Sequence, residues 1–391
     1  MTDLPSRVDP ADYTRALTRS GELLQYVDNN CQADVGAAID ELRQLAEQYA
    51  ENEHVADNYA MALILPAYHQ PTPVAWQLVE ASRGLVARWP KSRRICTSHA
   101  CTLANAIARA HDFDPGGLLT ELLGLVEQYD HDDFFDQRLA HAMKPLVERQ
   151  QVDVAWGLSV LRTAACAHSG NELTVGKYLE AVLHLMSKDP RGTYHLVGDL
   201  ESFLSQNPYL PSAREALAQA LNILIREEVV IQPPAWDRLY ALAQQFPQDT
   251  EVGKWYARGM ANATSCLDAA GRGWAVGKLT EIARTRPDDP QVAEMYALGL
   301  FNLSLTQDEA AQLATAQQLR HVLARFPSAE IALNLARVLF NLAKNQTGAT
   351  QASLQAELAA LGARFPQQSD IEQLSRSVPS APWFGGRGKR R

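Results

Sequence analysis

Histidine and aspartate gather in one stretch of the chain, where together they could hold a divalent metal ion. The residues are His111, Asp112, Asp114, Asp130, His131, Asp132, Asp133 and Asp136. Carboxylates and imidazoles are common ligands of such ions. The two halves of the stretch, however, fall at opposite ends of one predicted helix, where aspartate serves as a helix cap and as solvated charge. We therefore interpret the stretch as two turns and predict no metal site.

Signatures of catalysis are missing from the sequence. It contains no glycine-rich phosphate loop, no HExxH, no GxSxG and no paired cysteine and histidine spacing. The 5 cysteines are odd in number and scattered without CxxC spacing, which disfavours both a disulfide framework and a structural zinc site. We predict that the protein is not an enzyme, with no catalytic residues and no cofactor.

Asparagine recurs near the ends of several predicted helices. The series comprises Asn105, Asn262, Asn302 and Asn341, with Asn222 one residue early. An amide supplies both a donor and an acceptor, so a row of amides suits the backbone of an extended peptide. Asparagine also tolerates the left-handed conformation that caps a helix C-terminus. Partner contact and helix capping both stay open as interpretations.

Basic side chains join this series in one region. Lys254, Arg258 and Asn262 lie at i, i+4 and i+8, so they share one face of a helix. Arg337 and Asn341 repeat the last two members further along the chain. Such a face suits a ligand, and it is equally typical of a charged surface that is simply solvated.

The last residues, 378–391, break all periodicity with proline and glycine and end on a basic cluster, which predicts a flexible tail. Trp383 and Phe384 lie in this tail with no obvious core to enter. An aromatic pair beside basic residues suits docking on a partner, contact with nucleic acid, or folding back onto the protein. A plain solubilising tail is the simpler interpretation.

The helices that position these residues follow a repeat of about 40 residues. Each unit ends in a turn that often pairs an aromatic residue with proline, and the prolines from residue 208 onward lie 39 to 40 residues apart. The turn markers are Pro90, Pro208, Pro247, Pro287, Pro327 and Pro366, with Ala50, Asp130 and Gly170 in the equivalent places of other units.

After each turn, apolar residues recur in a helical stripe. Counted from the first of them, the stripe has offsets of 0, 4, 5 and 8, which mark one face of an α-helix and would scatter over both faces of a strand. Offset 5 is alanine in most units, and in this count Glu180 is the exception. A methyl group lets the neighbouring helix approach closely. The alanines are Ala60, Ala100, Ala140, Ala218, Ala257, Ala297 and Ala336.

A second helix in each unit carries its own leucine stripe, as in DRLYALAQQFP and AELAALGARFP. Proline just past this helix cannot continue its hydrogen-bond ladder. Asp249 and Asp289 then stand where a cap for the next helix is needed, and Pro290 suits a first helical turn.

This pattern resembles the tetratricopeptide (TPR) family over roughly residues 33–377. The resemblance is strongest in FPQDTEVGKWYARGMAN, RPDDPQVAEMYALGLFN and FPSAEIALNLARVLFN. It implies an all-α fold, a right-handed α–α superhelix of antiparallel helix pairs. The unit is about six residues longer than the family's usual 34, and alanine replaces the usual first-helix glycine. HEAT-like stacking of units of this length is the structural alternative.

The resemblance also implies a binding surface. In the family, first helices line a concave groove, where basic and asparagine residues can hold a carboxylate of a bound peptide. We accordingly predict partner contacts for a set of residues on the first helices and in the tail. They are Lys254, Arg258, Asn262, Asn302, Arg337, Asn341, Trp383 and Phe384.

The sequence predicts one α-solenoid of about nine helix pairs over residues 1–377. Its first helix covers residues 11–30 and pairs with residues 34–49, and DIEQLSRS near residue 370 forms a truncated capping helix. A solenoid exposes the apolar face of a terminal repeat unless something caps it. Because this cap is short, homodimerisation through a terminal repeat is an expected mode of assembly.

Net charge and hydropathy limit which classes of partner the protein is expected to bind. A net charge of -9 argues against a general polyanion binder. No apolar run of 18 residues and no secretory signal are evident, so we expect a cytoplasmic protein without a membrane partner. The leading hypothesis is a non-enzymatic adaptor that binds a protein or peptide segment, acidic or C-terminal, in its groove. The alternative is a nucleic-acid-associated subunit that uses concave Arg and Lys and the basic tail.

Overall fold

A computed structural model describes residues 10–111 and 113–378. In these ranges the chain forms twenty helices and no strand, which confirms the all-α prediction. The helices are α1 (Pro10–Asn30), α2 (Gly36–Gln48), α3 (Glu53–Ala62), α4 (Ile64–His69), α5 (Thr72–Arg88), α6 (Arg93–Arg109), α7 (Gly116–Gln128), α8 (Asp133–Glu148), α9 (Val154–Ala167), α10 (Glu172–Lys188), α11 (Leu196–Gln206), α12 (Pro211–Arg226), α13 (Ala235–Gln245), α14 (Thr250–Cys266), α15 (Ala269–Thr285), α16 (Pro290–Ser304), α17 (Glu309–Arg325), α18 (Ala329–Asn345), α19 (Gly348–Arg364) and α20 (Ser369–Ser377).

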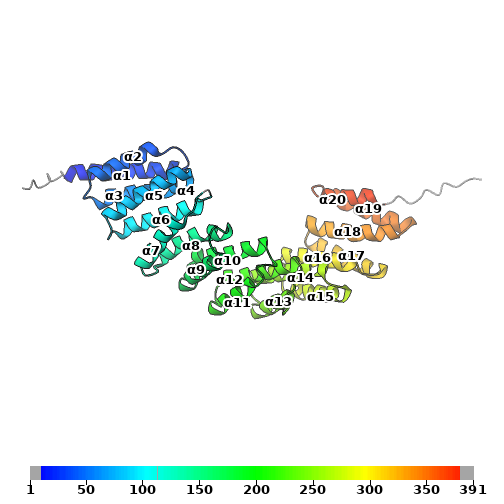
Figure 1. Cartoon of the computed structure of the whole chain (residues 1–391). Coiled ribbons are helices and arrows are strands. Elements are labelled where there is room, and N and C mark those ends of the chain that lie inside the picture. Colours follow the sequence, from blue (N-terminus) through cyan, green and yellow to red (C-terminus); the bar gives the residue numbers. More distant parts are fainter. Residues whose placement is uncertain (1–9, 112, 379–391) are drawn as a thin grey trace, which may run out of the picture. The chain divides into compact units, whose positions relative to one another are not determined.

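Consecutive helices pair in sequence order, each pair joined by a short turn (Figure 1). The first helix of a pair packs on its own second helix and on the first helix of the next pair, as α14 does on α15 and α16. We call these helices the first-helix row and the second-helix row. The predicted start holds, since α1 pairs with α2, and the first helix of the second pair is split into α3 and α4.

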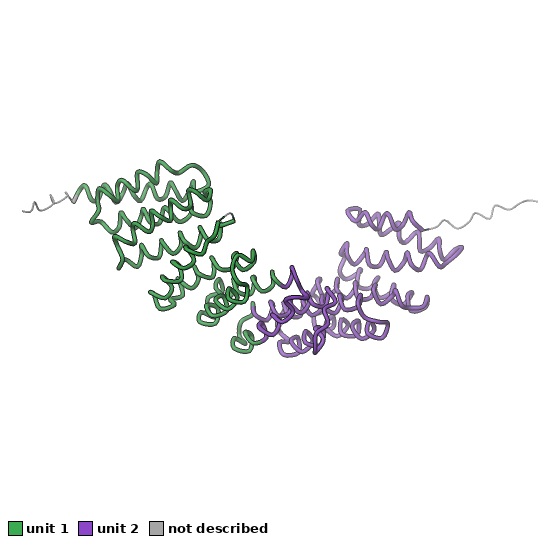
Figure 2. Tube along the Cα trace, viewed as in Figure 1, with its two compact units in different colours: residues 1–185, 202–212 green, residues 186–201, 213–391 purple. Residues whose placement is uncertain are grey.

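The chain divides into two compact units (Figure 2). Unit 1 comprises residues 1–185 and 202–212, and unit 2 comprises residues 186–201 and 213–391. Within unit 2, the first-helix row includes α14, α16 and α18, and the second-helix row includes α13, α15, α17 and α19. Unit 2 carries every predicted partner-contact residue that the structure describes.

The buried alanine stripe confirms the close packing predicted for the first helices. All seven alanines at offset 5 are at most 1% exposed, so each lies against a neighbouring helix without room for a larger side chain. Gly259 and Gly299 serve the same purpose against the second-helix row. A Cβ atom on either would stand 2.4 Å from a leucine side chain, Leu239 or Leu279.

One unit has a different register from the one predicted. The side chain of Asn171 accepts hydrogen bonds from the backbone of Leu173 and Thr174, so it caps α10 one residue earlier than the marker Gly170 implied. The stripe of α10 therefore consists of Thr174, Tyr178, Leu179 and Val182, all buried, while Glu180 is exposed. Leu179, and not Glu180, is the residue that departs from alanine.

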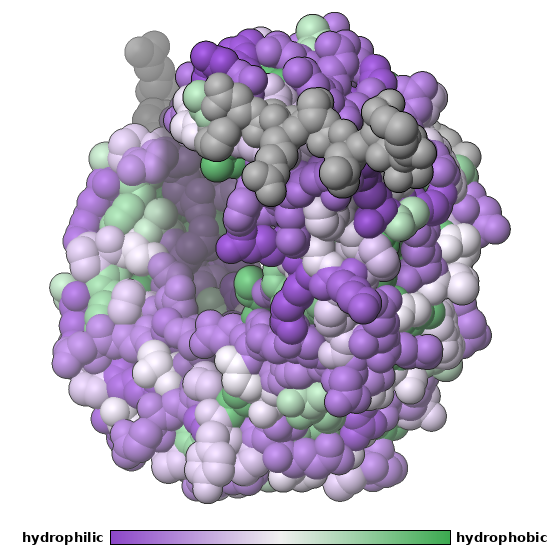
Figure 3. Space-filling model, turned by 90° about the vertical axis from the view of Figure 1, so that its left-hand side faces the viewer, coloured by the Kyte–Doolittle hydropathy of each residue, from purple (hydrophilic) through white to green (hydrophobic). Residues whose placement is uncertain are grey.

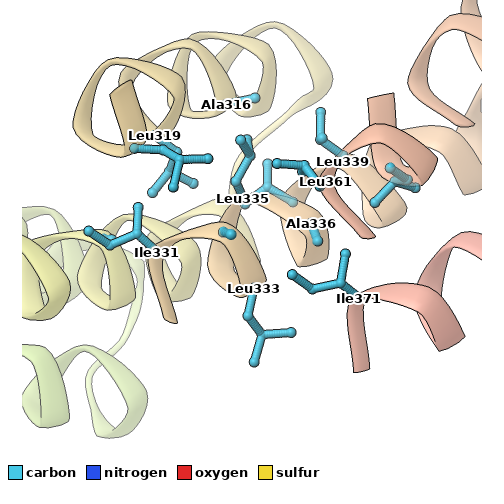
Figure 4. Close-up of a cluster of buried hydrophobic side chains, with 14 of the residues drawn as sticks. Ala316, Leu319, Ile331, Leu333, Leu335, Ala336, Leu339, Leu361 and Ile371 are labelled. Carbon is cyan, nitrogen blue, oxygen red and sulfur yellow. The ribbon is translucent and has the colours of Figure 1, made fainter. Parts of the chain in front are cut away.

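The C-terminal end is closed by α20, as predicted. Ile371 of α20 is fully buried against α18 and α19, beside Leu335, Leu339 and Leu361 (Figure 4). Val378, the first residue of the predicted tail, is instead 5% exposed and belongs to this cluster. The predicted tail beyond it lies outside the described residues.

The helix caps in unit 2 are formed by the residues that the sequence predicted. Asp249 accepts hydrogen bonds from the backbone of Glu251 and Val252, and Asp289 does the same for Gln291 and Val292. Pro290 occupies the first turn of α16. Both caps and the first-turn proline are as predicted, and they fix where the first helices of unit 2 begin.

The face shown in Figure 3 is mostly hydrophilic, with hydrophobic side chains in small scattered groups. Among the helices that the structure describes, none combines the length and apolar character needed to span a membrane.

Candidate functional site

A hollow of about 270 Å³ lies on the first-helix row of unit 2, and we call it the α14 hollow. Lys254 and Arg258, two of the predicted contact residues, both line it. They lie one turn apart on α14, with Trp255 between them in sequence. The other lining residues come from the flanking first helices α12 and α16 and from the start of α14, namely Glu215, Glu251, Gln291, Glu294 and Met295.

The carboxylates of the α14 hollow are already engaged within the chain. Glu215 accepts hydrogen bonds from Gln219 Nε2 at 2.9 Å and from Trp255 Nε1 at 3.4 Å. Glu294 accepts one from Ser328 Oγ at 2.6 Å. Lys254 Nζ lies 2.8 Å from Glu251 Oε1, and this hydrogen bond raises the pKa of the lysine. Lys254 is therefore a paired cation that balances one carboxylate of the hollow.

Arg258 differs from Lys254 because it has no carboxylate partner in the part of the chain that the structure describes. Its Cζ atom lies 5.1 Å from the centre of the Trp255 ring, an arrangement typical of a cation–π contact. The side chain is exposed, so its guanidinium donors face solvent while the indole supports it from one side. A carboxylate can bind such a group with two parallel hydrogen bonds.

Arg337 on α18 repeats this arrangement. Its Cζ atom lies 5.4 Å from the centre of the Phe301 ring on α16, and no described carboxylate pairs with it. Because α14 packs on α16 and α16 on α18, the two arginines stand two steps apart along one row of first helices. The sequence pattern thus places two aromatic-supported guanidinium groups in one row.

The predicted asparagines do not join the arginines in the hollow. Asn262 Nδ2 donates to Asn222 Oδ1 at 2.9 Å, and Asn302 Nδ2 donates to Thr264 Oγ1 at 2.8 Å. Each bond joins a first helix to the first helix before it. α14 ends at Cys266, four residues after Asn262, so this asparagine is not a helix cap either.

Unit 1 contains asparagine hydrogen bonds between repeats as well. Asn58 donates to Ser20 Oγ at 2.9 Å, and Asn105 donates to the Ile64 carbonyl at 2.9 Å. The signal was available in the sequence, since each donor stands 38 to 41 residues after its acceptor, one repeat apart. Asn105, Asn262 and Asn302 of the series thus each bond to the preceding repeat.

The remaining predicted contact residues are placed as follows. Asn341 is half-buried on α18 and has no hydrogen-bond partner within the described ranges. Trp383 and Phe384 lie outside the described residues. Of the predicted set, the structure therefore brings Lys254 and Arg258 together at one hollow, with Arg337 further along the same row.

The histidine and aspartate stretch forms a junction between turns in unit 1. Buried Asp136 is 2.8 Å from His168 Nε2 and 3.2 Å from His131 Nδ1. His168 Nε2 also lies 2.9 Å from the His131 carbonyl. Within residues 10–111 and 113–378, no group of three or more histidine, cysteine or acidic residues could hold a metal ion. Sequence reasoning missed His168, which comes from the following turn.

A serine, a histidine and a glutamate form a hydrogen-bonded chain in unit 1 that sequence reasoning also missed. Ser82 Oγ lies 2.7 Å from His99 Nδ1, and His99 Nε2 lies 2.9 Å from Glu121 Oε1. Burial raises the pKa of Glu121, but hydrogen bonds from His99 and Arg83 outweigh it and lower the pKa to about 2. A nucleophilic serine must reach a substrate. Ser82 is 1% exposed and also lies 2.8 Å from the Val79 carbonyl, so this chain joins α5, α6 and α7 structurally.

Comparison with known proteins adds no relative. No protein-family model matches the sequence, and no curated protein matches it significantly.

Proposed function

We propose that this protein is a non-enzymatic adaptor that binds an extended peptide segment of a partner protein along the first-helix row of unit 2. The arginine at the α14 hollow carries the proposal. Arg258 is exposed, supported by Trp255 and without a carboxylate in the described part of the chain, whereas the other charged residues of the hollow have partners. A guanidinium held in this way is available to a carboxylate from outside.

Arg337 supplies a second anchor for the same segment. Neighbouring helix axes lie about 8–10 Å apart, so two steps along the row place the anchors roughly 16–20 Å apart. An extended peptide advances about 3.3 Å per residue. We therefore expect the bound segment to carry two carboxylates about five or six residues apart, one of which can be its C-terminus.

The charges of the hollow restrict the segment further. Glu215, Glu251 and Glu294 line the same space as Arg258 and Lys254, so carboxylates outnumber cations there. A continuous acidic run would be repelled by these residues. Single carboxylates separated by neutral or apolar residues avoid this repulsion, and Trp255 and Met295 offer apolar surface to the residues between them.

The resemblance to the TPR family also implies an architecture for the chain. We propose a TPR-like right-handed superhelix whose first helices line the concave side, with a cytoplasmic location and the possibility of pairing through a terminal repeat. HEAT-like stacking is the alternative, and both arrangements keep α14, α16 and α18 in one row. The location of Arg258 and Arg337 on one binding surface therefore does not depend on the choice.

Selection of peptides from a random phage-displayed library on the immobilised, full-length protein tests the function. We expect enriched sequences to carry two carboxylates about five or six positions apart, and we expect the enrichment to disappear on an Arg258→Ala, Arg337→Ala double variant. The Arg284→Ala variant is the matched control, because Arg284 is an exposed arginine on the second-helix row. Failure to enrich any sequence, or equal enrichment on the double variant, would contradict the proposal.

Nucleic-acid binding is the second candidate, favoured by a basic cluster on α8 and α10. Lys177, Arg138 and Lys144 surround His141, and burial together with their positive charges lowers the pKa of this histidine. Lys144 and Lys177, however, both lie near Glu180, at 3.1 Å and 3.6 Å. A mobility shift with single- and double-stranded probes that weakens as salt rises would support this candidate, and no shift at low salt would dismiss it.

A further inference from the structure

A second and larger cavity in unit 2 lies away from the first-helix surface described above. It has a volume of about 520 Å³ and lies among α13, α14, α15 and the turn before α14. Its apolar wall contains Tyr240, Phe246 and Ile282, and Arg286 lies at the end of α15. Neither Arg258 nor Arg337 lines it.

The next repeat offers a direct comparison, because it contains the equivalent cavity among α15, α16 and α17. That cavity has a volume of only about 230 Å³. Phe326 stands there in the place that Arg286 takes in the larger cavity, Arg286 stands in the place of Phe246, and Ala293 replaces Gly253. The aromatic turn residue is the usual one in this chain, as Trp89, Phe246 and Phe365 show. Each cavity therefore has one turn phenylalanine and Arg286 in its wall, and the two cavities differ in which of their turns carries the arginine.

The guanidinium of Arg286 is held against the main chain on one side of the cavity. It donates hydrogen bonds to three carbonyls of the turn before α14, those of Pro247, Asp249 and Thr250, at 3.2, 2.6 and 3.1 Å. Gly253 permits this position, since a Cβ atom there would stand 2.4 Å from Arg286 Cζ. Arg286 and Gly253 therefore pack directly against each other in the cavity wall.

The cavity wall also contains a polar group without a partner. Tyr256 is 4% exposed, and its hydroxyl makes no hydrogen bond within the described part of the chain. Burial raises the pKa of Tyr256, so the hydroxyl keeps its proton and can both donate and accept. An unpaired buried hydroxyl costs free energy that a suitable ligand recovers.

We infer that this cavity binds a small neutral aromatic molecule with a hydroxyl or carbonyl group. Tyr240 and Phe246 in the cavity wall set the aromatic part of the ligand, which would lie beside their rings. The Tyr256 hydroxyl sets the polar group. Glu281 and Arg286 both line the cavity and have opposite charges, so neither sign of ligand charge is favoured. Cavities of this volume are typical of small-molecule sites.

Ligand-observed NMR with p-cresol, and with toluene as its analogue without the hydroxyl, tests the inference on the full-length protein. We expect p-cresol to bind the wild type and to bind the Arg286→Phe variant at least tenfold more weakly, because the equivalent cavity, which has Phe326 at this position, has a volume of about 230 Å³ against about 520 Å³. This variant keeps Arg258 and Arg337, so its effect is separate from peptide binding. Absence of p-cresol binding to the wild type at millimolar concentration would overturn the inference.

The Tyr256→Phe variant tests the polar contact without changing the ring. We expect it to weaken p-cresol binding roughly tenfold, as the loss of one hydrogen bond implies, and to leave toluene binding unchanged. Tyr296→Phe, at the same position of the next repeat, is the matched control and should change neither affinity. Equal affinities of p-cresol for wild type and Tyr256→Phe would show that the hydroxyl is not part of a site.

Discussion

Arginine residues of unit 2 serve two different purposes. The guanidinium groups of Arg286 and Arg320 bind other parts of the chain and stabilise the fold. Arg286 donates hydrogen bonds to carbonyls of the turn before α14. Arg320 forms a bidentate pair with Glu357 at 2.7 and 2.8 Å, which joins α17 to α19. Arg258 and Arg337 lie on aromatic rings with no carboxylate partner among the described residues. Composition alone cannot separate these two groups, because the difference depends on which acceptors each side chain reaches.

The asparagine bonds between repeats lead to a stability prediction. Asn262→Ala removes the donor to Asn222, which is 4% exposed and would be left with an unsatisfied buried oxygen. We expect the free energy of unfolding to fall by about 1–3 kcal/mol, as measured by urea denaturation. Asn341→Ala is the matched control, since Asn341 has no hydrogen-bond partner within the described ranges, and should cost less than about 0.5 kcal/mol. Equal losses for both variants would contradict the structural role assigned to Asn262.

Glu121 predicts a pH dependence of stability in unit 1. The pKa of this group falls from its usual 4.5 to about 2 in the folded protein. A carboxylate with a lowered folded pKa stabilises fully above its unfolded pKa, and this contribution is lost as pH falls from 4.5 toward 2. The difference in unfolding free energy between wild type and Glu121→Gln should therefore be largest near neutral pH and shrink below about pH 4.5.

Glu127→Gln, an exposed change on the same helix, is the control for this pH series. Urea denaturation at several pH values between about 7 and 3 measures all three proteins. A difference between wild type and Glu121→Gln that stays constant over this range would contradict the assigned hydrogen bonds.

At the scale of helices, the offset-5 alanines set how closely first helices pack. Ala297 on α16 is fully buried, so Ala297→Leu would force neighbouring helices apart. We expect a loss of about 1–3 kcal/mol or more in the free energy of unfolding. Gln291→Leu, exposed on the same helix, should change it by less than about 0.5 kcal/mol. A stable Ala297→Leu protein would show that α16 is not closely packed at this position.

Periodicity predicted the helices well, because buried stripes and turn residues are local signals. The caps at Asp249 and Asp289 and the closing helix α20 all followed from residue type and spacing. Periodicity misplaced the buried stripe of α10 by one residue, because the turn before this helix lacks the usual proline marker. The cap Asn171 and the buried Thr174 would have corrected it, since the other first helices also begin with a capping side chain three residues before the stripe.

The candidate site was less predictable than the helices. Helical spacing correctly placed Lys254 and Arg258 on one surface. It also placed Asn262 there, but the amide of Asn262 bonds to a residue 40 positions earlier, and no local pattern shows that choice. The Arg286 cavity depends in the same way on a comparison between repeats and on the direction of one side chain.

For the whole molecule, each helix pair packs mainly on its neighbours, so a destabilising substitution should loosen only the helices near it. Ile371 is the fully buried residue of α20, so Ile371→Ser should raise amide hydrogen exchange in α18, α19 and α20. Exchange in α6 and α8 of unit 1 should stay unchanged. Mass spectrometry of exchanged peptides measures both regions in one experiment. Faster exchange throughout the chain would indicate a single cooperative unit instead.

Peptide binding along the first-helix row of unit 2 is the central claim, and calorimetric titration with one peptide selected on the wild type tests it most directly. The protein variants are Arg258→Ala, Arg337→Ala, the double variant, and Arg284→Ala as the control. Each single loss of a charged hydrogen-bond donor should weaken binding about 10- to 100-fold, and the double variant should lose more than either. Arg284→Ala should bind like the wild type. Wild-type affinity in the double variant, with its fold intact, would contradict the claim.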